Sequence, residues 1–186
     1  EVKVVPLRVR EGDDASCLNL NKAIRPLLYG VKTSEFEGRF SFSEGNWTSL
    51  QEASNGVIPA LVDQNTLMWA LKKGVGDRIQ FLDGGGQPFE VELKAVVKGS
   101  LLQGALYLDE NLFLEKFPQQ GGYRFFFLEG AKEVGDEAAR HLESKLSNYG
   151  LDFQTTSERL EELNKVENTY LSIFQGLGGL GLLLGT

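Results

Sequence analysis

Short runs of hydrophobic residues, many of them alternating with polar ones, recur along most of the chain. Such runs, bounded by Gly, Pro, Asn or Asp, predict β-strands. Pro6 interrupts the alternation of the first run, so we expect an edge strand or a bulge there. The run at 123–129 is apolar enough to predict a central strand. The strands expected are residues 2–10, 27–31, 39–42, 56–62, 78–82, 89–97, 105–109, 123–129 and 151–154.

Helical patterns separate several of these strands. Asp63 is expected to cap a helix over 64–73, and Asp109 to cap a short helix over 110–117 that Pro118 ends. A longer helix is expected over 131–149, with an apolar face formed by Val134, Ala138, Leu142, Leu146 and Tyr149 and a stop at Gly150. Strands alternating with helices in this order predict an α+β fold.

The pattern changes after residue 154. Thr155 and Glu158 have the spacing of a capping box, which predicts the start of a new helix. Residues 168–186 then contain no charged residue. Because a bilayer core needs about 20 apolar residues in a helix, we expect a connecting helix that leads into a membrane segment. A flexible Gly- and Leu-rich tail or a buried helix is the alternative interpretation. The residues expected to form this membrane and coupling helix are Leu160, Leu163, Val166, Tyr170, Phe174, Gly178, Gly179 and Gly181.

Residues 166–186 resemble the start of the transmembrane helix that follows the extracytoplasmic domain of FtsX-like ABC transporter permeases, the MacB and lipoprotein-release group. Residues 12–20, and residues 58–64 followed by Gly76-Asp77, resemble a bacterial branch of the same family. The resemblance implies a porter-like lobe of ferredoxin-like βαβ type, a smaller and mostly β lobe, and a long helix leading to the membrane. We therefore expect a β-rich part at 1–56, the porter-like lobe at 57–157, and the connecting helix with the start of a membrane segment at 158–186.

The same resemblance implies a function in transport. The chain would be the extracytoplasmic, MacB-like periplasmic core domain of a permease in the cell membrane. It would couple conformational change driven by ATP to the export or extraction of a substrate, or to the activation of an envelope partner. ATP hydrolysis would belong to a separate ATP-binding cassette subunit or domain. Further partners implied are a second permease copy and an envelope protein, peptide or lipid substrate. The alternative is a membrane-tethered module that binds a peptide or protein and has no transport role.

Charge and cysteine content narrow the function further. The formal net charge is −7, and no basic stripe is present, so a nucleic-acid partner is disfavoured. The single cysteine, Cys17, excludes an intramolecular disulfide and a Cys-based zinc site. A small buried hydrophobe and a reactive thiol remain the two interpretations of Cys17. Because the first residues form a strand-like pattern, we expect no signal peptide within this sequence.

No motif in the sequence predicts catalysis, a cofactor or a metal. The carboxylates Asp63, Asp77, Asp109 and Glu110 fall mostly at expected helix caps and turns. His141 is the only histidine, and we expect it on the exposed surface of a helix.

Two loops invite a ligand-binding interpretation, and neither fits it. The glycine loop at 83–88 leads into a strand, whereas a phosphate-binding loop leads into a helix with a Lys, so we expect a hairpin turn. Asp13 and Asp14 lack the further oxygen ligands of a calcium loop.

Overall fold

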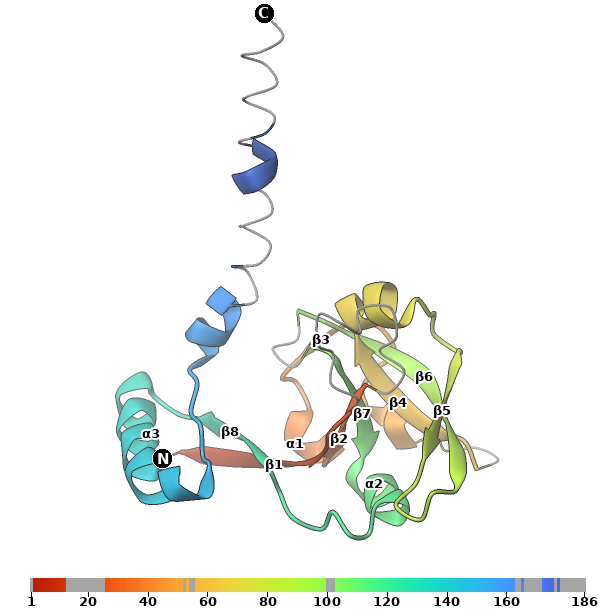
Figure 1. The fold of residues 1–186 in the computed structure, drawn as a ribbon, viewed down its shortest axis with the longest axis horizontal. Coiled ribbons are helices and arrows are strands. Elements are labelled where there is room, and N and C mark those ends of the chain that lie inside the picture. Colours follow the sequence, from red (N-terminus) through yellow and green to blue (C-terminus); the bar gives the residue numbers. More distant parts are fainter. Residues whose placement is uncertain are drawn as a thin grey trace, which may run out of the picture. The chain divides into compact units, whose positions relative to one another are not determined.

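The computed structural model describes residues 2–12, 26–51, 53, 56–99, 103–162, 165, 172–175 and 177 (Figure 1). The chain divides into two compact units, Glu1–Lys132 and Glu133–Thr186. The first unit contains all the strands of the described residues, and the second is helical. The expected mixture of strands and helices in one α+β fold is confirmed.

The first unit is built on one mixed sheet. Its strands follow the order β3-β6-β4-β7-β2-β1-β8, and β5 pairs with β6 beside that path. The β2–β7 and β4–β6 pairs are parallel, and all other pairs are antiparallel. The strands are β1 (Lys3–Arg10), β2 (Leu27–Val31), β3 (Ser41–Glu44), β4 (Ile58–Asp63), β5 (Arg78–Leu82), β6 (Pro88–Lys98), β7 (Ala105–Asp109) and β8 (Phe125–Glu129).

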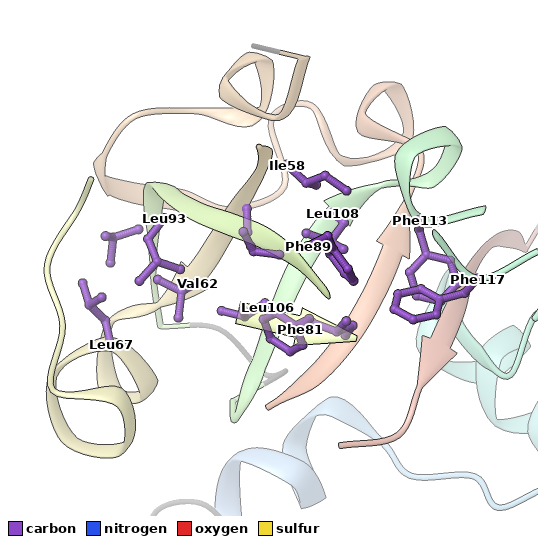
Figure 2. Close-up of a cluster of buried hydrophobic side chains, with 14 residues drawn as sticks. Ile58, Val62, Leu67, Phe81, Phe89, Leu93, Leu106, Leu108, Phe113 and Phe117 are labelled. Carbon is purple, nitrogen blue, oxygen red and sulfur yellow. The ribbon is translucent and has the colours of Figure 1, made fainter. Parts of the chain in front are cut away.

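Short helices cover both faces of this sheet. Because successive residues of a strand point to opposite faces, the central strands contribute to two separate clusters of buried side chains. The Trp47 cluster packs beneath the helix α1 (Thr33–Phe36) and the 3-10 helix η1 (Trp47–Gln51). The Phe113 cluster packs beneath the helix α2 (Glu110–Lys116) and the π-helix η2 (Thr66–Leu71) (Figure 2).

The two clusters divide the core residues between them. The Trp47 cluster contains Val5, Leu7, Tyr29, Val31, Phe36, Trp47, Leu50, Leu61, Ala95, Val97, Ala105 and Tyr107. The Phe113 cluster contains Leu28, Ile58, Ala60, Val62, Leu67, Phe81, Phe89, Val91, Leu93, Val96, Leu106, Leu108, Phe113 and Phe117.

One glycine is required by the packing of α2. Gly30 lies in β2, and a Cβ atom at this position would come within 2.8 Å of the ring of Phe113. Its lack of a side chain lets the helix approach the sheet closely. Phe113 in turn packs against Phe117, with ring centroids 5.2 Å apart.

Most of the expected strands are present. The second strand has the expected bounds, and the glycine loop at 83–87 joins β5 and β6 as the expected hairpin. Pro6 lies opposite Phe126 of β8, whereas β2 pairs only with residues 8–10 of β1. The first half of β1 therefore has a strand partner on one side only, which is a position that tolerates proline.

Three strand predictions are corrected. The third strand is Ser41–Glu44, shifted from the expected 39–42. β8 is the last strand in the sheet order, so the prediction of a central strand at 123–129 was wrong. Its apolar residues are only half-buried because one edge of the strand has no strand partner in the described residues. Residues 151–154 form no strand, since no ladder of backbone hydrogen bonds pairs them with another segment of the described chain.

The second unit contains the end of the chain. The helix α3 (Lys132–Leu146) begins at the boundary between the units, and the 3-10 helix η3 (Ser147–Tyr149) continues it. Gly150 ends it in the left-handed conformation with φ of 78°, as the sequence predicts. Residues 156–162, 165, 172–175 and 177 are helical. The division into residues 1–56, 57–157 and 158–186 expected from the sequence stays a prediction. The sheet contains strands from both 1–56 and 57–157.

Candidate functional site

The residues expected to form the membrane and coupling helix are described only in part. Leu160 lies in the helical residues 156–162 and Phe174 in the helical residues 172–175, and both side chains are exposed. No helix within the described part of the chain is long and apolar enough to cross a membrane. The other expected residues, Leu163, Val166, Tyr170, Gly178, Gly179 and Gly181, lie outside the described residues, as do Cys17, Asp13 and Asp14.

The expected capping box at the start of this helix is confirmed. The backbone N–H and the hydroxyl of Thr155 both donate to Oε2 of Glu158 at 2.8 Å. The backbone N–H of Glu158 donates to the Thr155 hydroxyl at 3.2 Å, and Arg159 N–H donates to the Thr155 carbonyl at 3.0 Å. The backbone hydrogen bond from Thr155, and to a smaller extent the hydrogen bond from its hydroxyl, hold the pKa of Glu158 below its ordinary value. Two of the orphan N–H groups at this helix start are thereby satisfied.

The first and last strands of the sheet lie side by side at one of its edges. β1 and β8 are antiparallel, and Lys3 at the start of β1 lies opposite Glu129 at the end of β8. Both ends are joined to the α1 region by ion pairs: Lys3 Nζ lies 2.9 Å from Glu35 Oε2, and Arg39 Nη1 lies 2.6 Å from Glu129 Oε2. The hydrogen bond and charge of Lys3 hold the pKa of Glu35 below its ordinary value. At this end of the sheet the chain therefore enters β1 and leaves β8.

A buried ion pair joins β1 to α2. Arg8 Nε donates to Glu110 Oε1 at 2.8 Å, and both side chains are almost fully buried. The Arg8 guanidinium also donates to the carbonyl of Gly121 and lies over the Tyr123 ring, 4.3 Å from its centroid. Lys32 Nζ lies 3.7 Å from the second carboxylate oxygen of Glu110. The buried charges therefore have partners on several sides, as a structural ion pair requires.

The charge of Glu110 also acts on Lys32. The pKa of Lys32 is raised because the Glu110 carboxylate favours its ammonium form, with a further hydrogen bond to Tyr123.

The opposite end of the sheet carries an exposed helical turn. β4 runs parallel to β1, because β1 is antiparallel to β2, β2 is parallel to β7, and β7 is antiparallel to β4. The π-helix η2 follows the end of β4, so it lies at the end of the sheet away from Lys3 and Glu129 (Figure 1).

Hydrogen bonds fix the base of η2. Asp63 is buried, and its carboxylate accepts from the backbone N–H of Thr66 at 2.9 Å and from the Thr66 hydroxyl. The backbone N–H of Gly104 donates to the Thr66 hydroxyl at 2.8 Å and to the Asp63 carboxylate at 3.2 Å. Asp63 thus caps the helix as the sequence predicts, and it also joins the helix to the turn before β7.

The outer side of η2 exposes large apolar side chains. Leu67 packs into the Phe113 cluster, whereas Met68 is 51% exposed and Trp69 is 73% exposed. Lys72 follows in the left-handed conformation with φ of 52°, and its N–H donates to the carbonyl of Leu67. A π-helix bonds each residue to the fifth before it, is rare, and occurs frequently at functional sites.

Sequence reasoning placed a helix at η2 but did not single out its exposed residues. A signal was present, because the stretch Leu67-Met68-Trp69-Ala70-Leu71 is apolar without a break. One helical face cannot bury five consecutive residues, so some of them had to be exposed.

The other polar residues considered from the sequence either accept backbone hydrogen bonds or lie exposed on a helix. Asp109 caps α2 by accepting from the N–H of Asn111 at 2.9 Å, and Asp77 accepts from the N–H of Gly74 at 2.8 Å. Asp83 closes the hairpin loop by accepting from the N–H groups of Gly85 and Gln87. His141 is exposed on α3. Among the described residues, no group of three or more His, Cys, Asp or Glu side chains is placed to hold a metal ion.

Comparison with known proteins identifies solved structures of similar fold. The chain is similar to the periplasmic region of MacB from Actinobacillus actinomycetemcomitans, with 17% identity and a TM-score of 0.41, over 76% of this chain and 66% of that structure. It is also similar to the extracellular domain of the noncanonic ABC-type transporter YknZ from Gram-positive bacteria, with 16% identity and a TM-score of 0.42, over 81% of this chain and 77% of that structure. No protein-family model and no curated protein sequence matches the chain.

Proposed function

We propose that this chain is the extracytoplasmic domain of an FtsX-like ABC transporter permease. The antiparallel pairing of β1 with β8 carries the proposal, because Lys3 lies opposite Glu129. A domain inserted in a longer chain receives and returns that chain at neighbouring points, and the start of β1 and the end of β8 are neighbours in this sheet. In the proposal the chain then continues through α3 to the connecting helix. The resemblance of residues 166–186 to the start of a permease transmembrane helix supports the same role.

The proposed role is mechanical coupling. ATP hydrolysis takes place in a separate ATP-binding cassette subunit or domain, and the membrane helices transmit the resulting movement to this domain. The helix that starts at the Thr155–Glu158 capping box is the connecting element, and residues 168–186 begin the membrane segment. The movement serves export or extraction of a substrate, or activation of an envelope partner, with a second permease copy completing the transporter. β8 and α3 belong to the porter-like lobe in this proposal.

Cysteine labelling in the full-length protein tests the location. Tyr149 is 86% exposed, and Cys17 is the only cysteine in the sequence of this domain, so Tyr149→Cys with Cys17→Ser introduces one accessible thiol into the domain. The parent full-length protein with Cys17→Ser alone gives the background labelling. A membrane-impermeant maleimide should label this thiol in intact spheroplasts as completely as in lysed ones. Labelling only after lysis would place the domain in the cytoplasm and exclude the proposal.

A proline in the connecting helix tests the coupling. Arg159→Pro removes the N–H that donates to the Thr155 carbonyl, and a proline inside a helix costs about 3 kcal/mol locally. We expect the full-length transporter with Arg159→Pro to keep its expression and ATP hydrolysis but to lose most of its transport.

Arg159→Ala is the matched control, since it removes the same side chain and its 3.3 Å contact with Glu162 but keeps the helix. Normal transport by the proline variant would contradict the coupling role.

A further inference from the structure

The outer side of η2 and the turn after it form one exposed surface of mixed apolar and basic character. We call it the η2 tip, and it consists of Met68, Trp69, Ala70, Lys72, Lys73 and Val75, all of which are exposed. Neither lysine forms an ion pair with any other described residue. The nearby carboxylate of Asp77 accepts a hydrogen bond from the backbone of Gly74 at 2.8 Å. The η2 tip itself thus carries two positive charges and no negative one, with the single carboxylate of Asp77 beside it, in a chain whose formal net charge is −7.

The η2 tip is held in place from below. Leu67 is buried in the Phe113 cluster, and Leu71 packs against the same cluster. The Asp63–Thr66–Gly104 hydrogen bonds fix the start of the helix, and the N–H groups of Lys72 and Lys73 both donate to the carbonyl of Leu67 at its end. Trp69 and Met68 are thus presented by an anchored turn, and little conformational entropy remains to be lost when they bind.

We propose that the η2 tip docks on an anionic membrane surface. Trp is enriched at the boundary between lipid and water, where its amphipathic ring fits the headgroup region. Lys extends its charge toward the headgroups while its methylene stem stays in the apolar layer. Protein–protein interfaces are also enriched in Trp and Met but are depleted in Lys, so it is the two lysines that favour an anionic lipid surface.

The proposal has a consequence for the domain proposed above. The chain enters β1 at Lys3 and leaves β8 at Glu129, at one end of the sheet. The η2 tip lies at the other end. Contact at the η2 tip would provide a second attachment to a bilayer, independent of residues 168–186. Membrane docking by the η2 tip does not require the permease assignment, and the experiment separates the two.

Tryptophan fluorescence of the full chain reads out the contact directly. The chain has two tryptophans, and Trp47 is 6% exposed among the rings of Phe36, Phe40 and Phe42, so a change in emission on binding reports Trp69. On vesicles that contain phosphatidylglycerol, we expect the emission to shift to shorter wavelength and quenching by acrylamide to fall. On vesicles of phosphatidylcholine alone, we expect neither change. Flotation of the protein with the phosphatidylcholine vesicles separately reports insertion of the uncharged run.

Charge neutralisation provides the quantitative test. With Lys72→Asn and Lys73→Gln together, the lipid concentration needed for the phosphatidylglycerol-dependent shift should rise about 30-fold. Each basic residue near an anionic surface contributes about 1 kcal/mol, and about 1.4 kcal/mol corresponds to a tenfold change in affinity. Asn suits the left-handed conformation of Lys72. Lys3→Gln with Lys116→Gln removes the same charge from the other end of the same sheet, where β1 starts and α2 follows β7. This control should leave the shift within about twofold, since a distant exposed charge is screened beyond about one Debye length.

Three results would overturn the proposal. The first is flotation with an unchanged Trp69 emission, which would assign membrane binding to the uncharged run alone. The second is an equal shift on phosphatidylcholine vesicles, or equal weakening by the two double variants. The third is a shift that appears with protein concentration in the absence of vesicles, which would mean that a second copy of the chain covers the η2 tip.

Discussion

The central strands and the β1–β8 pair belong to one sheet but are stabilised differently. All six residues of β4 are buried, and so are the first four of β7, because side chains cover both faces of the sheet there. None of the five residues of β8 is fully buried, and Val4 and Phe126 expose about half of their side-chain surface. Burial of apolar surface is the main favourable term in folding. The central strands therefore carry most of the stability of the sheet.

The β1–β8 pair buries only one of its faces. Val5 and Leu7 lie within the Trp47 cluster and Phe125 and Phe127 pack against it, whereas Val4 and Phe126 are exposed on the other face. The ion pairs Lys3–Glu35 and Arg39–Glu129 are partly exposed, and exposed pairs contribute about 0–1 kcal/mol each. Segments with few buried contacts open at a lower free energy than the core. β8, where the chain leaves the sheet, is thus expected to open at a lower free energy than β4 and β7, because none of its residues is fully buried.

Truncation of aromatic side chains should separate the two regions most strongly. Phe113 is fully buried against Gly30 and Phe117, so Phe113→Ala should lower the free energy of unfolding by about 3–5 kcal/mol. Phe126 is 45% exposed, and Phe126→Ala should cost about 1 kcal/mol or less. Equilibrium urea unfolding measures both losses. Equal losses would show that β8 belongs to the same cooperative core as β4 and β7.

A buried and an exposed ion pair provide a second, smaller contrast. Glu110→Gln leaves the Arg8 guanidinium buried without its carboxylate, and breaking a buried pair costs about 3 kcal/mol or more. Glu90→Gln breaks an exposed pair with Arg78 and should cost less than about 1 kcal/mol. Replacing both buried partners, as in Arg8→Met with Glu110→Leu, should restore most of the lost free energy of unfolding in the same urea titration. Failure to recover it would show that Arg8 also stabilises the Gly121–Tyr123 segment in a way that apolar packing cannot replace.

The features that the sequence predicted correctly depend on residues close together in the chain. The caps at Asp63, Asp109 and Thr155 each join residues two or three positions apart. The β5–β6 hairpin depends on a five-residue loop closed by Asp83. Such local hydrogen bonds are determined by residue type and spacing, so sequence patterns suffice to find them.

The features that the sequence did not reveal depend on long-range pairing. Apolar content alone suggested a central strand at 123–129, but the position of β8 in the sheet depends on its pairing with β1, whose residues are more than a hundred positions away. The Arg8–Glu110 pair spans a similar separation. The exposure of Trp69 required knowing which side of η2 the Phe113 cluster covers. Residues 151–154 have a strand-like composition but no strand partner in the described chain. Composition alone does not determine whether a partner strand is present.

The smallest effect concerns the helix that follows the sheet, and pH tests it. The hydrogen bonds from Thr155 hold the pKa of Glu158 below its ordinary value, so the ionised carboxylate stabilises the folded helix start. This stabilisation is fully present above the ordinary glutamate pKa and is lost as the pH falls through the lowered one. Thr155→Ala removes the hydroxyl that accepts from the Glu158 N–H, and loss of such a cap costs about 1 kcal/mol.

NMR provides the measurement for this helix. We expect carboxyl-carbon titration to show a lowered pKa for Glu158 in the native chain and a pKa closer to the ordinary value in Thr155→Ala. Hydrogen-exchange protection of residues 156–162 should fall in Thr155→Ala, while protection of β4 and β7 stays unchanged, because the cap belongs to the helix and not to the core of the sheet. Glu161 is an exposed glutamate of the same helix outside the capping box, so Glu161→Gln is the matched control and should change neither value. A Glu158 pKa that is not lowered in the native chain would show that the capping box does not form in solution, and the helix would then lack the defined start that the coupling proposal requires.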